Sequence, residues 1–326
     1  MPGKASTETS AKTLVITARQ LQSLENKAKL LASLGPSVAI AILARENGPC
    51  TLACYQYGAV LVKNARRTLY STHIAGLFSC LCTIMWTIRQ VQASGGELPE
   101  TINNRFGMRW NKTWVQSNSF GTHFVDPSPA SLSALEALPP GEPVFNHHGS
   151  YAGLFGQQLQ ADWLRAYFDC YMKPTDALRQ RIEHLTTKYK LTARRTVVTC
   201  YRGTDKKIEV VPDALDMYIA ATRKMMAETD AEQILIQTDQ TQVRDEFRRI
   251  FGGSCIFIEE LPTTEGSVVM HLTNDRLPDR DAWTMDLLAM CFALSACRGI
   301  VTHTGNVGFF LAMMAMLNGA KVVQLK

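Results

Sequence analysis

From residue 193 to the end of the chain, short runs of apolar and β-branched residues alternate with longer amphipathic segments. Parallel neighbouring strands need a crossover connection, so strands that alternate with helices form a parallel sheet with helices on both faces. The pattern predicts strands at 196–200, 234–237, 255–258, 299–303 and 321–325, and helices at 213–227, 240–251, 281–297 and 306–317. We therefore expect an α/β fold whose second half is a doubly wound parallel sheet.

The segment 307–317 is apolar on nearly every side. A helix of this kind has to be buried, because it offers no polar face to water. We expect either another domain or a partner chain to cover it, which leaves both a monomer and a homodimer open.

The first half of the chain has a less regular pattern. Apolar residues spaced at threes and fours predict a helix over 12–34, which Gly35-Pro36 would end. The run 38–43 fits a strand or a helix. A strand at 68–74, a turn at Gly76 and helices at 78–91, 157–171 and 175–189 are predicted beyond it.

The length points to two domains. A chain of 326 residues exceeds the ~250–300 residues at which a single core stops growing. The polar segment 188–192 is the predicted boundary, which gives an N-terminal α/β domain at 1–190 and a C-terminal domain at 191–326.

Residues 99–150 are predicted to be irregular, since they are rich in Asn, Pro and Gly. An irregular segment of this length is usually functional or disordered, and its aromatic residues argue against disorder. Two interpretations stay open: the aromatics bind a sugar acceptor, or they attach the loop to the core. The residues concerned are Trp110, Trp114, Phe120, Phe124 and His147-His148.

Composition limits the possible partners and compartments. The net charge is +5 without any long block of Lys and Arg, which suits a small anionic ligand and does not favour nucleic acid. The nine cysteines form no zinc-type pair, so we expect buried free thiols in a reducing compartment and no metal site.

The first ten residues lack the apolar core of a signal peptide, and no apolar run is long enough for a membrane span. We expect a cytoplasmic protein, with a removed anchor left open.

Three predicted strands end in polar residues, and parallel strands bring these ends to one edge of the sheet, where ligands of α/β proteins bind. Two cations at this edge suit a diphosphate, and a glycine before a helix allows an anion to approach its N-terminal amides. The alternatives are a charged surface turn at the first end and helix caps at Thr238, Asp239 and Thr304. The residues at these ends are Arg202-Gly203-Thr204-Asp205-Lys206, Thr238-Asp239 and Thr302-His303-Thr304-Gly305-Asn306.

The stretch Cys200-Tyr201-Arg202-Gly203-Thr204-Asp205-Lys206 resembles the first signature of the fucosyltransferase superfamily, a strand followed by His-x-Arg-x-Thr-Asp-Lys. That group includes the core α1,6-, the rhizobial nodulation and the protein O-fucosyltransferases. The resemblance implies a GT-B-like fold, with two Rossmann-like domains whose parallel sheets face each other across a cleft. It also implies inverting, metal-independent transfer of fucose from GDP-fucose to an acceptor hydroxyl, without a further cofactor.

The resemblance also implies roles for single residues. Arg202 would contact the β-phosphate and the glycosidic oxygen, with Lys206 assisting, and Glu209 would be the general base. Thr204, Asp205 and Asp239 would belong to the donor site. Asp286 would touch guanine, and the cluster Thr304, Gly305 and Asn306 would touch phosphate.

The chain departs from the family pattern at several positions. Cys200 replaces the His, Gly203 stands in place of a second cation, Glu209 comes one residue early, and Ser79 interrupts the Gly-rich corner after Gly76. Two rival functions therefore remain: a glycosyltransferase that uses another nucleotide sugar, and a non-catalytic relative that binds a nucleotide or a glycan. From residue types alone, Asp205 is expected to hold Arg202 or a backbone turn.

Overall fold

The computed structural model describes residues 12–17, 38–43, 50–55, 58–63, 65–71, 76–104, 119–140, 161–192, 195–204, 213–266, 268 and 280–325. The chain divides into two compact units. The first comprises Met1–Gly76, Thr83–Thr122 and Asp126–Pro143, and the second comprises Leu77–Cys82, His123–Val125 and Val144–Lys326.

The second unit is built on a five-stranded sheet with the order β11-β10-β7-β8-β9. Every pairing in this sheet is parallel, which confirms the α/β fold predicted from the alternating pattern. The strands are β7 (Thr196–Tyr201), β8 (Gln233–Thr238), β9 (Cys255–Ile256), β10 (Gly299–His303) and β11 (Lys321–Leu325). Only β9 is clearly shorter than predicted.

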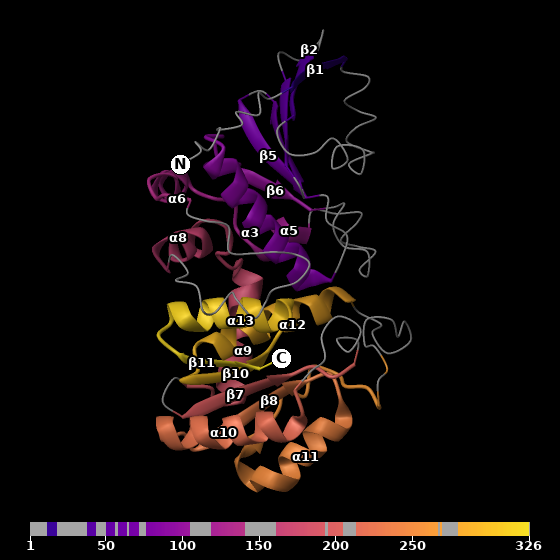
Figure 1. The fold of residues 1–326 in the computed structure, drawn as a ribbon, viewed down its shortest axis with the longest axis vertical. Helices are drawn as coiled ribbons and strands as arrows, with labels where there is room; N and C mark the ends of the chain where they lie inside the picture. The colour runs from indigo at the N-terminus through magenta and orange to yellow at the C-terminus, as the bar shows by residue number, and fades with distance from the viewer. Residues whose placement is uncertain are drawn as a thin grey trace, which may run out of the picture. The chain divides into compact units, whose positions relative to one another are not determined.

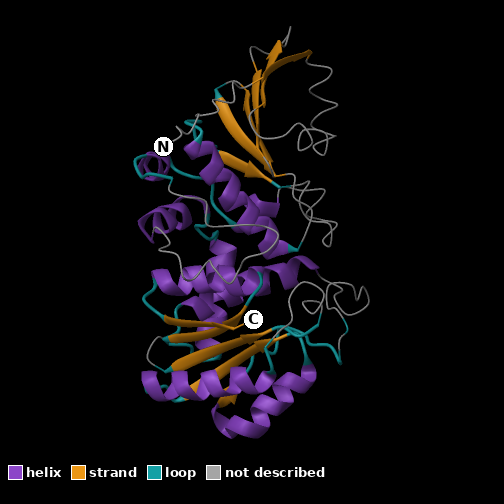
Figure 2. Cartoon of the chain, viewed as in Figure 1, coloured by secondary structure: helices purple, strands orange, loops and turns teal. Residues whose placement is uncertain are grey.

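Helices cover both faces of this sheet. Helices α10 (Leu215–Thr229) and α11 (Thr241–Phe251) lie on one face, and α12 (Arg280–Ser295) and α13 (Asn306–Leu317) lie on the other (Figures 1 and 2). A short 3-10 turn, η2 (Gly252–Ser254), connects α11 to β9. This layering is what right-handed crossovers between parallel strands produce.

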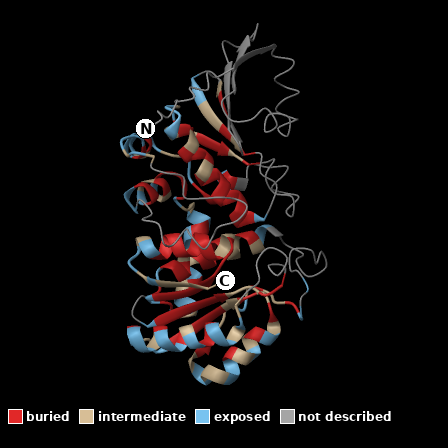
Figure 3. Ribbon diagram, in the orientation of Figure 1, coloured by how far each residue is buried: buried red, intermediate tan, exposed pale blue. Residues whose placement is uncertain are grey.

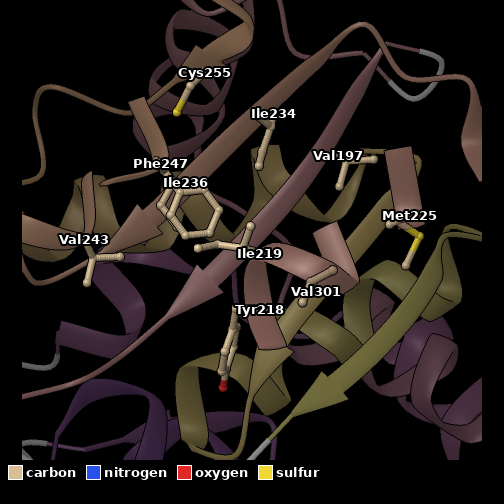
Figure 4. Packing of buried hydrophobic residues seen from close by; sticks show 10 residues of the cluster. All are labelled: Val197, Tyr218, Ile219, Met225, Ile234, Ile236, Val243, Phe247, Cys255 and Val301. Atoms are coloured by element: carbon tan, nitrogen blue, oxygen red, sulfur yellow. The ribbon is translucent and has the colours of Figure 1, made fainter. Parts of the chain in front are cut away.

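The core between the sheet and helices α10 and α11 is apolar. Figure 4 shows Val197, Ile234 and Ile236 of the strands facing Ile219 of α10 and Phe247 of α11. All five side chains are buried. In Figure 3 the strands β7, β8 and β10 are coloured mostly as buried, whereas the outer faces of α10 and α11 are largely exposed or intermediate. Burial of this kind contributes roughly 25 cal/mol per Å² of apolar surface.

The apolar helix α13 is buried along Gly308–Ala315, which confirms that it is covered. It packs on α12, β10, β11 and α8 (Ala161–Tyr171), all of which belong to the second unit. The ring of Phe310 lies 5.5 Å from that of Phe168 in α8. The unit therefore covers this helix with its own elements.

Helix α9 (Asp176–Lys188) belongs to the second unit and makes charged and polar contacts with its other elements. Arg181 Nε donates to Asp286 Oδ1 of α12 at 2.5 Å. Just past the helix, the hydroxyl of Tyr189 donates to Glu260 Oε2 at 2.5 Å, and Lys188 Nζ lies 3.1 Å from Glu260 Oε1. Burial raises the pKa of Glu260, but the hydrogen bonds from Tyr189, the backbone and Lys188 outweigh burial and lower the pKa to about 2. Glu260 is thus a well-satisfied structural carboxylate.

The first unit contains a six-stranded sheet in sequence order. Its strands are β1 (Lys12–Thr17), β2 (Val38–Leu43), β3 (Cys50–Tyr55), β4 (Gly58–Lys63), β5 (Arg66–Ser71) and β6 (Thr101–Asn103). The pairs β1–β2 and β5–β6 are parallel, whereas β2 to β5 pair antiparallel. The sheet is therefore mixed and not parallel throughout as expected, because short connections join β3, β4 and β5 and only antiparallel strands can be joined in this way.

The predicted helix at 12–34 is wrong over Lys12–Thr17, which forms β1. Residues 18–34 lie outside the described residues. The segment Lys12–Thr17 contains Val15, Ile16 and two threonines, and β-branched residues favour strands. The undecided run at 38–43 is the strand β2.

The prediction that 99–150 is irregular is wrong at β6, α5 (Ser119–His123) and α6 (Pro129–Glu136). Helix α6 begins with a capping box, in which Ser128 Oγ accepts from the backbone N–H of Ser131. Phe120 and Phe124 are buried, which favours attachment to the core over sugar binding for these two aromatics. Trp110, Trp114 and His147-His148 lie outside the described residues.

The predicted helices at 78–91, 157–171 and 175–189 correspond to α3 (Leu77–Ala93), α8 and α9. The seven cysteines whose side chains are described are free and buried, as predicted for them. Among the described helices, none is both long and apolar enough to cross a membrane.

The close packing of α13 on β10 gives a first prediction. A Cβ at Gly308 would overlap the carbonyl oxygen of His303 and lie 2.6 Å from Thr302 Oγ1. We expect Gly308→Ala to lower the free energy of unfolding by about 1–3 kcal/mol, because α13 must move away from the strand although Ala is the better helix former. Urea denaturation measures the change. Gly253→Ala is the control, since nothing lies within 4 Å of its Cβ position; equal stability of the two variants would contradict the packing.

Candidate functional site

Three neighbouring strands, β10, β7 and β8, end in polar residues at the carboxyl edge of the parallel sheet. Tyr201 of β7 pairs with Thr238 of β8, so the residues that follow, Arg202 and Asp239, come at the same level. The register of β10 with β7, continued along both strands, brings Thr304 to this level as well. This is the edge at which open α/β sheets bind ligands.

The side chains of Arg202, Thr204 and Asp239 form one cluster at this edge. Arg202 Nε lies 3.7 Å from Asp239 Oδ2, and Thr204 Oγ1 donates a hydrogen bond to the same oxygen at 2.5 Å. The Arg202 side chain is 24% exposed, the Asp239 side chain is 16% exposed, and Thr204 is buried. The guanidinium therefore reaches the surface of the edge, while the carboxylate that accompanies it lies deeper.

The surroundings of Asp239 disfavour the charged form of its carboxylate. Burial raises its pKa, and the opposing effects of the Arg202 charge and of the hydrogen bonds from Thr204 and the Gly203 N–H do not offset burial. Within the described part of the chain, Asp239 Oδ1 is buried and has no hydrogen-bond partner. An acceptor buried in this way costs folding free energy.

Gly203 after β7 and Gln240 after β8 are in close contact. A Cβ at Gly203 would overlap Gln240 Oε1 and lie 2.9 Å from its Cδ, so the glutamine side chain occupies the space that a side chain at 203 would need. Gln240 is buried, and its Nε2 donates to the carbonyl oxygen of Gly266 at 2.5 Å. The backbone N–H of Thr264 donates to the carbonyl oxygen of Asp239 at 2.9 Å. The segment Thr264–Gly266 therefore supports this side of the cluster.

Cys200, which stands where the fucosyltransferase signature has His, lies within the sheet. Its Sγ donates to Gln237 Oε1 at 2.8 Å, and burial raises the pKa of the thiol to about 12. A neutral buried thiol contributes packing at this position and brings no positive charge to the site.

The third strand end leads into helix α13. Thr304 Oγ1 donates to the carbonyl oxygen of Leu325 at 3.0 Å and accepts from Gln324 Nε2 at 3.2 Å, so its hydroxyl joins β10 to β11. Gly305 follows in an extended conformation, and Asn306 begins the helix. The N-terminal amides of a helix favour an anion at such a position.

The alternative that Thr238, Asp239 and Thr304 are helix N-caps is wrong. The residues at the N-cap positions are Gln240 for α11 and Gly305 for α13, and neither end has a side-chain cap. Thr238 Oγ1 instead accepts from the backbone N–H of Gln240 at 3.3 Å. The polar residues at these strand ends are thus not explained by capping.

The structure places the remaining predicted residues elsewhere or does not describe them. The Asp286 carboxylate pairs with Arg181, as described above, and its guanine contact stays a prediction. Asp205, Lys206 and Glu209 lie outside the described residues. Over the described ranges, no group of three or more His, Cys, Asp or Glu side chains is placed to hold a metal ion.

Sequence reasoning missed Gln240 and the segment Thr264–Gly266. Gly203 at a strand end was the available signal, because a glycine there often marks the close approach of another group. The approaching side chain comes from a different strand, however, and the sequence pattern does not identify it.

No protein-family model matches the sequence, and no curated protein matches it. Among solved structures, NodZ α-1,6-fucosyltransferase co-crystallized with GDP is 15% identical, with a TM-score of 0.47, over 76% of this chain and 92% of that one. Fucosyltransferase NodZ from Bradyrhizobium is 14% identical, with a TM-score of 0.47, over 76% and 93%. A mutant of FUT1 from Arabidopsis thaliana in complex with GDP is 11% identical, with a TM-score of 0.34, over 79% and 49%. A likeness of this size assigns no activity to this chain.

The contact between Gly203 and Gln240 gives a second prediction. We expect Gly203→Ala to lower the thermal midpoint of unfolding, because the new methyl group would displace the Gln240 amide from its hydrogen bond with Gly266. Adding Gln240→Ala should recover part of the loss by making room for the methyl group. If the double variant unfolds no later than Gly203→Ala, Gln240 is not what excludes a side chain at 203.

Proposed function

We propose that this chain is a glycosyltransferase that transfers fucose from GDP-fucose, with inversion, to a hydroxyl group of a glycan or another acceptor. The observation that carries the proposal is the guanidinium of Arg202, which lies beside the partly buried carboxylate of Asp239 at the carboxyl edge of a parallel sheet. The resemblance of Arg202-Gly203-Thr204-Asp205-Lys206 to the fucosyltransferase signature supports the choice of donor.

The chemistry of the transfer requires positive charge at this edge. As the bond between the sugar and the diphosphate breaks, negative charge grows on the leaving phosphate. A guanidinium already fixed in place stabilises that charge more in the transition state than in the ground state. Arg202 would supply this charge, and Lys206 would add a second cation to the same diphosphate.

A second group has to take the proton of the acceptor hydroxyl. A carboxylate within hydrogen-bond reach of the attacking oxygen can act as this general base. In the proposed mechanism Glu209 has this role. Asp205, Thr204 and the cluster Thr304-Gly305-Asn306 would line the donor site, Asp239 would belong to the site beside Arg202, and Asp286 would contact guanine.

The donor site is tested by nucleotide binding. We expect GDP to bind more tightly than UDP or ADP in isothermal titration calorimetry. Arg202→Ala should weaken GDP binding by about 2 kcal/mol, the order of a lost charge-assisted contact. Arg249→Ala is the matched control, since Arg249 is an exposed residue of α11 that pairs with Glu246.

The outcomes of this titration separate the proposed function from its rivals. Equal binding of all three nucleotides, or no binding of any of them, would contradict the proposed fucosyltransferase activity. A preference for UDP or ADP would indicate a glycosyltransferase with a different donor. Selective GDP binding without transfer to any acceptor hydroxyl would indicate a nucleotide-binding relative that lacks activity.

The general base gives a further prediction. We expect Glu209→Gln to lower kcat for sugar transfer by about 10²–10⁴-fold, the usual contribution of general-base catalysis, while GDP affinity stays unchanged. Glu232→Gln is the control, because Glu232 is an exposed residue that precedes β8 at the opposite edge of the sheet. Full transfer activity of Glu209→Gln would rule out this residue as the base.

A further inference from the structure

Arg202 approaches Asp239 at the Nε side of its guanidinium, where Nε lies 3.7 Å from Oδ2. The same carboxylate oxygen accepts the hydrogen bond from Thr204 at 2.5 Å, which fixes the carboxylate in the direction of Arg202. A negative charge beside Nε restricts the plane of the guanidinium and the direction in which its fork points.

Asp239 is poorly explained as a structural residue. Glu260, a structural carboxylate of the same unit, is bonded through both oxygens, to Tyr189 and to Lys188. Asp239 accepts hydrogen bonds from Thr204 and the Gly203 N–H, but its Oδ1 is buried without a hydrogen-bond partner among the described residues. The 3.7 Å from Arg202 Nε to Oδ2 is longer than a hydrogen bond. A neutral amide would lose less free energy on burial at this position.

We propose that Asp239 is a positioning residue that orients Arg202 toward the ligand, and that the chain keeps a carboxylate there for ligand binding at a cost in stability. In this assignment Asp239 does not touch the ligand, so the sequence-based expectation that it contacts the donor is replaced. The part of the inference that names the ligand as a nucleoside diphosphate rests on the proposed function. The part that concerns Arg202 does not.

The substitution Asp239→Asn separates orientation from packing. The asparagine has the same shape, and its Oδ1 can still accept the hydrogen bond from Thr204 Oγ1. It lacks the negative charge beside Nε of Arg202, so the guanidinium loses its electrostatic restraint while the surrounding packing is kept.

The first experiment is a double-mutant cycle measured by calorimetric titration with GDP. We expect Asp239→Asn alone to weaken GDP binding about tenfold or more, and we expect it to have no further effect when Arg202→Ala is already present. A residue that acts through Arg202 cannot act when Arg202 is absent. If the two losses multiply in the double variant, Asp239 binds the nucleotide by itself and the proposal is overturned.

The second experiment compares stability with binding. We expect Asp239→Asn to unfold at the same temperature as the unsubstituted chain or at a higher one. Glu260→Gln should unfold at a lower temperature and keep its GDP affinity, because its carboxylate is satisfied by the fold. A fall in the midpoint of Asp239→Asn as large as that of Glu260→Gln would mean that Asp239 is structural, which contradicts the proposal.

The third experiment needs no ligand. The Nε–H resonance of Arg202 in ¹⁵N-labelled protein can be identified by its loss in Arg202→Lys, and its exchange with water can be measured. We expect exchange to accelerate about tenfold or more in Asp239→Asn, because the negative charge that disfavours base-catalysed removal of the Nε proton is lost. Unchanged exchange would overturn the positioning role. If the chain binds no GDP, the proposed function fails, and this measurement still decides whether Asp239 orients Arg202.

Discussion

The parallel register of β10, β7 and β8 is the constraint on which the candidate site depends. Because Tyr201 pairs with Thr238, the residues that follow, Arg202 and Asp239, leave the sheet side by side. The register itself is fixed by burial: Val197, Ile234 and their neighbours fill one face of the sheet, and a slip by one residue would turn them to the opposite face. Packing far from the edge thus determines which polar side chains meet at it.

The sequence predicted the fold best in segments whose residue pattern fits either a helix or a strand clearly. The predicted segments at 299–303, 306–317 and 321–325 coincide with β10, α13 and β11. The helix is apolar at nearly every position and is followed by Asn318-Gly319, and each strand contains two adjacent β-branched residues, Ile300-Val301 and Val322-Val323. The error at Lys12–Thr17 has a different cause. Within this segment Leu14 and Ile16 are two residues apart, which fits one face of a strand, and Val15, Ile16 and the threonines favour a strand. The antiparallel strands β3 and β4 were not predicted at all.

The candidate site was predictable in its location and only partly in its contacts. Strand ends rich in polar residues indicated the carboxyl edge, and Arg202 was found there. The carboxylate beside it is Asp239 of the next strand, whereas the sequence suggested its near neighbour Asp205, which lies outside the described residues. A pairing between residues of two strands depends on register, and register follows from tertiary packing, which local patterns do not contain. For the same reason, the packing of Gln240 over Gly203 could not be foreseen.

If the chain binds a diphosphate as proposed, the absence of a side chain at 203 makes the orientation of Arg202 more important. A cation at this position would share the binding of the diphosphate with Arg202. Gln240 occupies that space with a neutral amide, which the hydrogen bond to Gly266 holds in place. Among the described residues of the cluster, Arg202 then supplies the positive charge, and the proposal adds Lys206 as a further cation. A guanidinium stabilises a developing charge best when it is oriented in advance. In the proposed assignment the partly buried carboxylate of Asp239, at the Nε side of Arg202, orients the guanidinium, which gives a reason for keeping a carboxylate there.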